Sequence, residues 1–194
     1  MPSKVFSAAL TGLNAQIVEV EVDACYGLPS FNIVGLPDKA IQESKDRVAS
    51  AIKSSGFQSP HQQPIRTLVS LAPADLKKEG SLYDLPISLG FLFATKQIKF
   101  DFQSRIFVGE LALDGNLRPI KGALSFALAA KEKGFKEIIL PWSNSAEAAL
   151  IKEIKAIGVK NLKETIDYLL GKKEISQTKI NPKGFLDKEN YPID

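Results

Sequence analysis

Residues 84–94, with the sequence DLPISLGFLFA, constrain the fold most because they are apolar on nearly every side of a helix. A surface helix carries one apolar stripe, whereas a helix that is apolar all round is buried. An apolar strand at residues 65–71 and a loop of mixed charge precede this segment. The sequence therefore predicts a helix enclosed by the rest of the fold, with Asp84 as its N-cap and proline near its first turn.

Three strands are predicted in the first 34 residues. Residues 4–9 and 16–24 alternate apolar and polar side chains, which is typical of half-buried strands, and Asn14 suits the turn between them. Residues 31–34 lie between two Gly-Leu-Pro sequences, so we predict an interior strand with a tight turn at each end. We expect these strands to form the first unit of a sheet.

A helical pattern begins at Asp38, with Pro37 in its first turn and Gly56 at its C-terminal end. Its apolar residues share one face, as expected of a helix that packs on a sheet. These residues are Ala40, Ile41, Val48, Ala51 and Ile52.

The second half of the chain alternates strands and helices. Residues 107–113 and 117–120 predict a hairpin around Asp114-Gly115-Asn116. Further along we predict a helix at 122–133, a strand at 137–140, a helix at 145–157, a strand at 159–162 and a helix at 164–170. This order predicts an α/β fold arranged as a two-layer sandwich.

The composition favours one soluble domain. The chain has 194 residues, of which 44% are hydrophobic, so it can bury one core. We predict a domain at residues 1–171 and a lysine-rich linker at 172–194. A single cysteine excludes an internal disulfide bond, and no apolar run approaches the ~18 residues of a membrane span. We expect a cytoplasmic protein without membrane contact.

Few residues are candidates for chemistry. Ser81 and Lys121 are the plausible members of a serine-lysine pair, but a capping serine and a solvated lysine are the favoured explanation. Asp75, Glu79 and Asp84 could bind Mg²⁺ in principle, but capping and turn roles suit them better. No GxxxxGK[ST] sequence occurs, so we expect no phosphate-binding loop and no cofactor in this chain.

A set of basic residues would meet on one side if the helix after Asp38, the mixed-charge loop and the hairpin are neighbours. The net charge of only +3 and the interspersed carboxylates favour a mixed, solvated surface. A nucleic-acid face stays open as the alternative. The predicted contacts with nucleic acid or a partner are Lys45, Arg47, Lys77, Lys78, Arg118 and Lys121.

Three long motifs carry a resemblance to a known family. Residues 27–52, 70–92 and 107–124 read GLPSFNIVGLPDKAIQESKDRVASAI, SLAPADLKKEGSLYDLPISLGFL and FVGELALDGNLRPIKGAL. Together they resemble the N-terminal domain of the magnesium-chelatase-like AAA+ ATPases of the ComM/YifB type. That domain is similar to the Lon protease core and to the C-terminal domain of RadA. The resemblance implies a ribosomal-protein-S5-domain-2-like (Lon protease-like) fold.

The same resemblance implies that the Lon catalytic dyad is absent. It places Leu82 at the position of the nucleophilic serine and Leu124 at the position of the lysine. It also implies an ATPase module beyond the linker, binding ATP and Mg²⁺, in a homo-hexamer that promotes branch migration of DNA during recombination and natural transformation. We therefore expect a non-catalytic domain that contacts its own module, neighbouring subunits or DNA. The alternatives are a residual serine-lysine hydrolase and a stand-alone nucleic-acid-binding domain.

Overall fold

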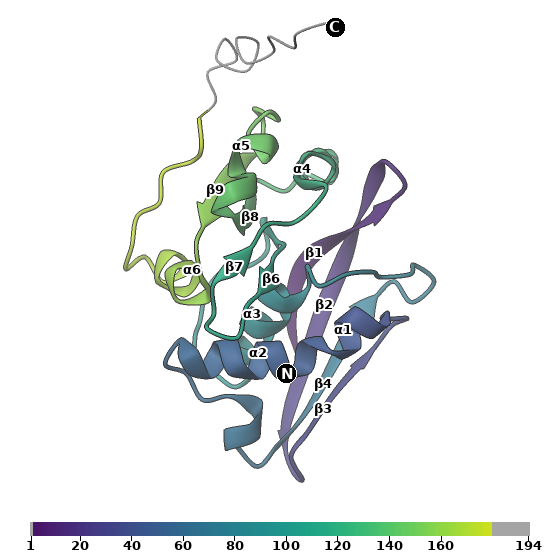
Figure 1. Cartoon of the computed structure of the whole chain (residues 1–194), viewed down its shortest axis with the longest axis vertical. Helices are drawn as coiled ribbons and strands as arrows, with labels where there is room; N and C mark the ends of the chain where they lie inside the picture. The colour runs from purple at the N-terminus through teal and green to yellow at the C-terminus, as the bar shows by residue number, and fades with distance from the viewer. Residues whose placement is uncertain (1, 180–194) are drawn as a thin grey trace, which may run out of the picture.

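A seven-stranded sheet in the order β3-β4-β2-β1-β5-β8-β9 organises the computed structural model, which describes residues 2–179 (Figure 1). Strand β2 pairs antiparallel with β1 and β4, and the remaining pairings in this sheet are parallel. The predicted α/β class is confirmed. The strands are β1 (Ser3–Thr11), β2 (Asn14–Tyr26), β3 (Ser30–Val34), β4 (Ile65–Ala72), β5 (Arg105–Phe107), β8 (Glu137–Pro141) and β9 (Lys155–Val159).

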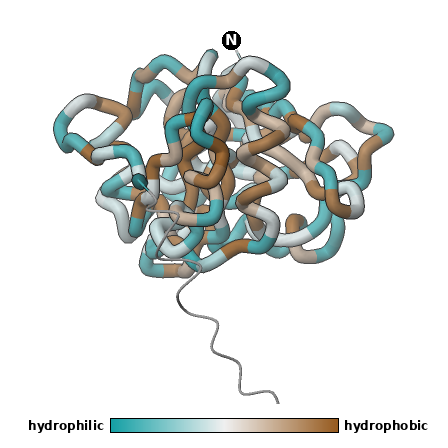
Figure 2. The backbone as a smooth tube through the Cα atoms, turned by 90° about the horizontal axis from the view of Figure 1, so that it is seen from above, coloured by the Kyte–Doolittle hydropathy of each residue, from teal (hydrophilic) through white to brown (hydrophobic). Residues whose placement is uncertain are grey.

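Helices cover the two faces of the sheet unequally. The first core cluster joins α1, α2, α3 and α6 to one face of the sheet, and the second joins α4 and α5 to the other face of β1, β5, β8 and β9. Figure 2 shows hydrophobic segments gathered in the middle of the molecule. The helices are α1 (Lys39–Gln42), α2 (Ser44–Ser54), α3 (Asp84–Ala94), α4 (Ala123–Glu132), α5 (Ser145–Ala148) and α6 (Leu162–Leu169), with short 3₁₀ turns η1 (Pro60–Gln62) and η2 (Trp142–Asn144).

Helix α3 spans the predicted residues, and every residue from its start to Leu92 is buried. Gly90 lets the helix approach the sheet, because a Cβ atom at this position would lie 2.7 Å from Cγ2 of Val22. The predicted N-cap is wrong, since Tyr83 occupies the cap position and Asp84 is the first helical residue. The Asp84 carboxylate is used instead for contacts between elements.

The predicted interior position of the strand at 31–34 is wrong, because β3 is an edge strand with β4 as its neighbour in the sheet. Phe31 and Ile33 are buried, whereas Asn32 and Val34 are exposed on the other face. A short apolar run between turns fits either position in a sheet. The sequence alone therefore did not separate edge from interior.

Three further boundaries differ from the prediction. The helix after Asp38 is interrupted at Glu43. Asp38 is the N-cap and not the first residue of this helix, and its carboxylate accepts a hydrogen bond from Ile41 N–H. The hairpin is shorter than predicted, with strands β6 (Glu110–Leu111) and β7 (Leu117–Arg118). The strand predicted at 159–162 lies at 155–159, after a helix that ends at Ala148.

The first part of the predicted linker lies against the domain. Ile175 packs against the first core cluster, and Thr178 N–H donates to the Ala156 carbonyl at 2.9 Å. Residues 180–194 of that linker lie outside the described residues. Within residues 2–179, the helices are too short or too polar to cross a bilayer.

Candidate functional site

The candidate site lies where the loop before α3 meets the hairpin. Gly80 N–H donates to the Asp38 carboxylate at 2.8 Å, which fixes the loop just ahead of Ser81. Gly80 has φ = 83°, a left-handed conformation that glycine adopts without strain. This turn places Ser81 and Leu82 in the lining of a cavity of about 320 Å³. Its lining residues are Leu10, Glu79, Gly80, Ser81, Leu82, Glu110, Pro119, Ile120 and Lys121.

The structure brings Ser81 and Lys121 to the same cavity but does not pair them. The Ser81 hydroxyl donates to the Glu110 carboxylate, and the other oxygen of Glu110 accepts from Arg118 Nη1 at 3.1 Å. Lys121 is exposed, and none of the hydrogen bonds found within residues 2–179 joins its ammonium group to Ser81. Glu110 is thus the partner that sequence reasoning missed, because its contact with Ser81 spans two separate segments.

Leucines occupy the two positions that the resemblance assigns to the Lon dyad. Leu82 is half-buried and packs against both core clusters, where it contributes to packing. Leu124 lies in the first turn of α4 with 38% of its surface exposed. Neither side chain can donate, accept or transfer a proton.

Asp84 ties three elements together beside this cavity. Arg47 from α2 donates from Nε at 2.8 Å and from Nη2 at 3.2 Å, and Leu111 N–H donates at 3.1 Å. Burial raises the pKa of Asp84 to about 6, while the hydrogen bonds from Arg47 and Leu111 act in the opposite direction. A bidentate contact of this kind fixes the orientation of α2 against α3.

The possible Mg²⁺ set is not assembled. Glu79 pairs with Lys77 and Asp84 pairs with Arg47. Within the described part of the chain, no three His, Cys, Asp or Glu side chains come together in a way that would hold a metal ion.

The predicted contact residues are largely occupied by other interactions. Arg47, Lys77 and Arg118 each pair with a carboxylate. Lys78 does not fit a surface contact, because it is fully buried and its ammonium group donates to the Pro73 carbonyl. Burial also lowers the pKa of Lys78. Lys121 is exposed and Lys45 is half-buried, so contact by these two stays a prediction.

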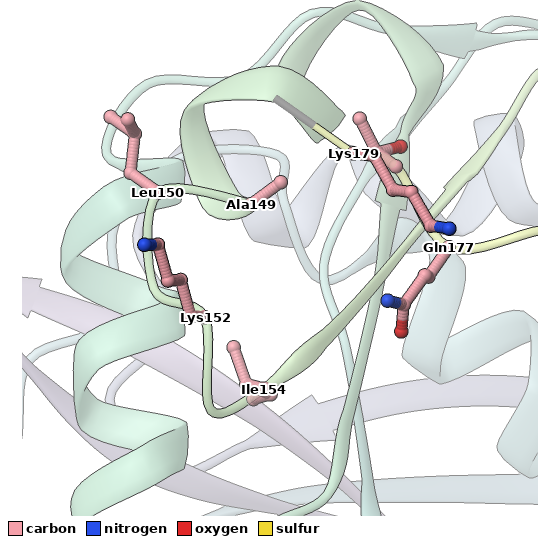
Figure 3. A pocket seen from close by; sticks show the side chains of 7 residues that line it. Ala149, Leu150, Lys152, Ile154, Gln177 and Lys179 are labelled. Carbon is pink, nitrogen blue, oxygen red and sulfur yellow. The ribbon is translucent and has the colours of Figure 1, made fainter. Parts of the chain in front are cut away.

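A second cavity, of about 310 Å³, lies away from Ser81, between the loop after α5 and the C-terminal segment (Figure 3). Ala149, Leu150 and Ile154 form one wall, and Gln177, Thr178 and Lys179 form the other. The cavity therefore lies at the junction between the domain and its C-terminal segment.

Comparisons with known proteins identify relatives that share this domain. Competence protein ComM of Haemophilus influenzae is 38% identical over 172 residues, which cover 88% of this chain and 33% of ComM. The uncharacterized protein YifB of Escherichia coli is 39% identical over 178 residues, which cover 91% of this chain and 34% of YifB. The chain thus spans about a third of the length of these curated relatives.

A weaker similarity supports the predicted Lon-like fold. Lon protease 2 of Bacillus subtilis is 25% identical over 169 residues, which cover 79% of this chain and 30% of that protease. The sheet flanked by helices is consistent with this likeness. A protein-family model described as subunit ChlI of Mg-chelatase matches residues 20–144. The chain therefore belongs to this magnesium-chelatase-like family.

Proposed function

We propose that this chain is a non-catalytic domain of a magnesium-chelatase-like AAA+ protein and that it helps to assemble the ring. The ATPase module, with its ATP and Mg²⁺, would be supplied by residues outside this chain. The observation that carries the proposal is that leucines, Leu82 and Leu124, stand at the two positions that the resemblance assigns to the Lon dyad. A Lon-like fold without a nucleophile and its base has no means of forming an acyl-enzyme.

Ser81 does not replace the missing nucleophile. Activation of a serine by lysine requires a desolvated amine within hydrogen-bond reach of the hydroxyl. The Ser81 hydroxyl instead donates to Glu110, and Glu110 is also paired with Arg118. Lys121 is exposed to water, so it lacks the desolvation that the reaction needs.

A serine-directed fluorophosphonate probe tests whether Ser81 is an activated nucleophile. We expect no probe adduct on Ser81 when the intact protein is incubated with the probe and analysed by mass spectrometry. Chymotrypsin in a parallel reaction confirms that the probe is active. A Ser81 adduct that disappears in the Lys121→Met variant would instead support the hydrolase alternative.

The assembly role is supported by an apolar patch at the β1–β2 turn and the outer side of α4. It consists of Leu10, Leu13, Leu124 and Leu128, which are 41%, 93%, 38% and 41% exposed. The turn is held against the helix because Ser125 Oγ donates to the Leu13 carbonyl at 2.8 Å. Exposed apolar clusters of this kind mark surfaces that bind other proteins. We assign this patch, named the α4 patch, to a neighbouring subunit.

Sedimentation velocity of the intact protein with a non-hydrolysable ATP analogue tests the α4 patch. The double variant Leu13→Asp, Leu128→Asp should shift the protein from rings toward smaller species, because it buries two charges in the contact. The matched control is Leu28→Asp, which changes a leucine that is 89% exposed outside the patch. Equal ring content in the double variant and the control would remove the assignment.

We further propose that the intact protein acts on DNA in branch migration during recombination and natural transformation. The support is the similarity to a protein named for competence. In a transformable host, deletion of the gene should lower the recovery of recombinants while DNA uptake stays normal. Unchanged recombinant frequencies would contradict this role and leave the assembly role intact.

A further inference from the structure

The two edges of the main sheet, β9 and β3, differ in how they are covered. At the β9 edge, the C-terminal segment lies against the strand, with Ile175 partly buried against the first core cluster and Thr178 N–H donating to the Ala156 carbonyl. At the β3 edge, no further strand pairs with Ser30–Val34 within residues 2–179. Natural edge strands are usually protected by charged residues, proline or a covering segment. Strand β3 contains neither a charged residue nor a proline.

The outward-facing groups of β3 can be identified. Gln42 Nε2 donates to the Ile33 carbonyl at 3.2 Å, so Ile33 directs its backbone away from β4. Alternation along a strand then directs the backbone of Phe31 the same way, whereas Ser30, Asn32 and Val34 face β4. The N–H and carbonyl of Phe31 and the N–H of Ile33 therefore face outward and are open for pairing. The Ile33 carbonyl also faces outward, but it accepts from the Gln42 amide.

We propose that this edge binds β3 of a second copy of the chain, antiparallel and about a two-fold axis at Asn32. Phe31 of each copy would exchange backbone hydrogen bonds with Ile33 of the other, which releases Gln42. Asn32 then lies opposite Asn32 in a non-hydrogen-bonded pair, where side chains approach most closely. Because the strand is uncharged, two identical strands meet without like-charge repulsion.

The exposed sheet face beside the edge fits the same partner. Asn32 is in register with Leu68, and Val34 is in register with Ser70. Val34, Leu68 and the nearby Leu36 are 46%, 36% and 57% exposed, and joining two sheets would extend this partly apolar surface across the axis. Five residues per strand cannot by themselves supply the roughly 1,200 Å² of a typical stable interface. We therefore expect a weak contact that becomes populated when subunits are already held in an assembly.

This contact is distinct from the α4 patch. A two-fold contact uses the same surface on both copies, whereas a ring is built from unlike surfaces. The β3 contact would therefore join two rings or two chains back to back. It can exist whether or not the α4 patch forms the ring.

Disulfide trapping tests the proposed register. In the intact protein carrying Cys25→Ser, Asn32→Cys should form a covalent dimer under mild oxidation, because directly opposed Cβ atoms lie within about 5.5 Å. Val34→Cys is the register control. Two copies of position 34 would lie about 13 Å apart along the strands, beyond the reach of a disulfide. Mixing Ser30→Cys with Val34→Cys should restore the dimer.

Charge reversal provides an independent measurement. Asn32→Lys and Asn32→Asp should each abolish the weak self-association seen by sedimentation at high concentration, whereas an equal mixture should restore it as a heterodimer. No trapping at position 32, or equal trapping at 32 and 34, would overturn the proposal. So would a monomeric protein that instead pairs only with added peptides. Trapping that persists in the Leu13→Asp, Leu128→Asp variant separates this contact from the ring.

Discussion

Asp84 joins α2, α3 and the hairpin through one carboxylate, and its environment sets a pH dependence. Its pKa is about 6 in the folded chain against 3.8 without the protein environment, because burial disfavours the charged form. The folded state therefore holds the proton more tightly. The stabilisation from this group is complete below about pH 4 and is lost as the pH rises through about 6.

Comparison with Asp84→Asn isolates this effect, because an amide does not titrate in this range. As the pH falls from 7 to 5, the unfolding free energy of the wild type should rise relative to that of the variant. Urea denaturation at several pH values measures the difference. A difference that shrinks on acidification would mean that Arg47, rather than burial, determines the pKa of Asp84.

Tyr83 is a buried residue, and removal of its hydroxyl oxygen should stabilise the fold. Its hydroxyl has no hydrogen-bond partner within the described residues, and burial raises its pKa. An unsatisfied buried hydroxyl costs roughly 1–3 kcal/mol. Tyr83→Phe should therefore increase the unfolding free energy by about 1 kcal/mol in chemical denaturation. A loss of stability would show that the hydroxyl has a partner, such as a bound water.

Local sequence reasoning failed where the partner of a residue is distant in the chain. The placement of Leu82 and Leu124 at the reactive positions of Lon follows from the resemblance of the motifs and stays a prediction. Local reasoning made Asp84 an N-cap, because a carboxylate before an apolar helix suits a cap. Its true partner, Arg47, lies on another helix that no local pattern connects to it.

At the scale of elements, the contact between α3 and the sheet depends on Gly90. Helix propensity favours alanine over glycine by about 1 kcal/mol. In this structure, however, the added Cβ would lie 2.7 Å from Val22 Cγ2 and 3.5 Å from Ser3 Oγ. Gly90→Ala should destabilise the protein by roughly 1–3 kcal/mol, because overpacking outweighs propensity.

Gly27→Ala is the matched control, since the nearest atom to its Cβ would be 3.8 Å away. We expect its unfolding free energy to change little or to rise slightly, because alanine restricts the unfolded chain. Thermal or urea unfolding of the two variants measures both effects. A stabilised Gly90→Ala would mean that α3 is free to move away from β2.

The sequence predicted elements best where one pattern of side chains extends over several helical turns. The bounds of α3 were correct because eleven residues without a polar face allow one interpretation. The break at Glu43 and the position of β9 were missed, because they depend on how short segments pack against neighbours. Whether β3 lies at an edge depends on strand order, which the alternation of side chains does not encode.

At the scale of the whole molecule, the C-terminal segment should be docked rather than free in solution. Thr178 N–H donates to the Ala156 carbonyl, and the partly buried Ile175 packs against the first core cluster. We expect the Thr178 amide to exchange slowly with solvent in NMR hydrogen exchange. Ile175→Ala should accelerate that exchange about tenfold, the effect of losing roughly 1.4 kcal/mol of local stability. Fast exchange of Thr178 in the wild type would contradict docking.

The matched control is Gly90→Ala, which changes the core and not the C-terminal segment. Amides in α3 open with the global unfolding of the core, so Gly90→Ala should accelerate their exchange and leave that of Thr178 nearly unchanged. If Thr178 accelerates together with the α3 amides, the segment opens only with the core. If only the α3 amides respond, residues 172–179 form a separately opening connection at the end of the domain.

Peptide hydrolysis is the decisive measurement for the proposal that this Lon-like domain is not a peptidase. Fluorogenic peptides and unfolded casein should be cleaved by the intact protein no faster than in a blank without protein, and equally by the Ser81→Ala and Lys121→Ala variants. Hydrolysis that is present in the wild type and lost in both variants would show that Ser81 and Lys121 form an active pair.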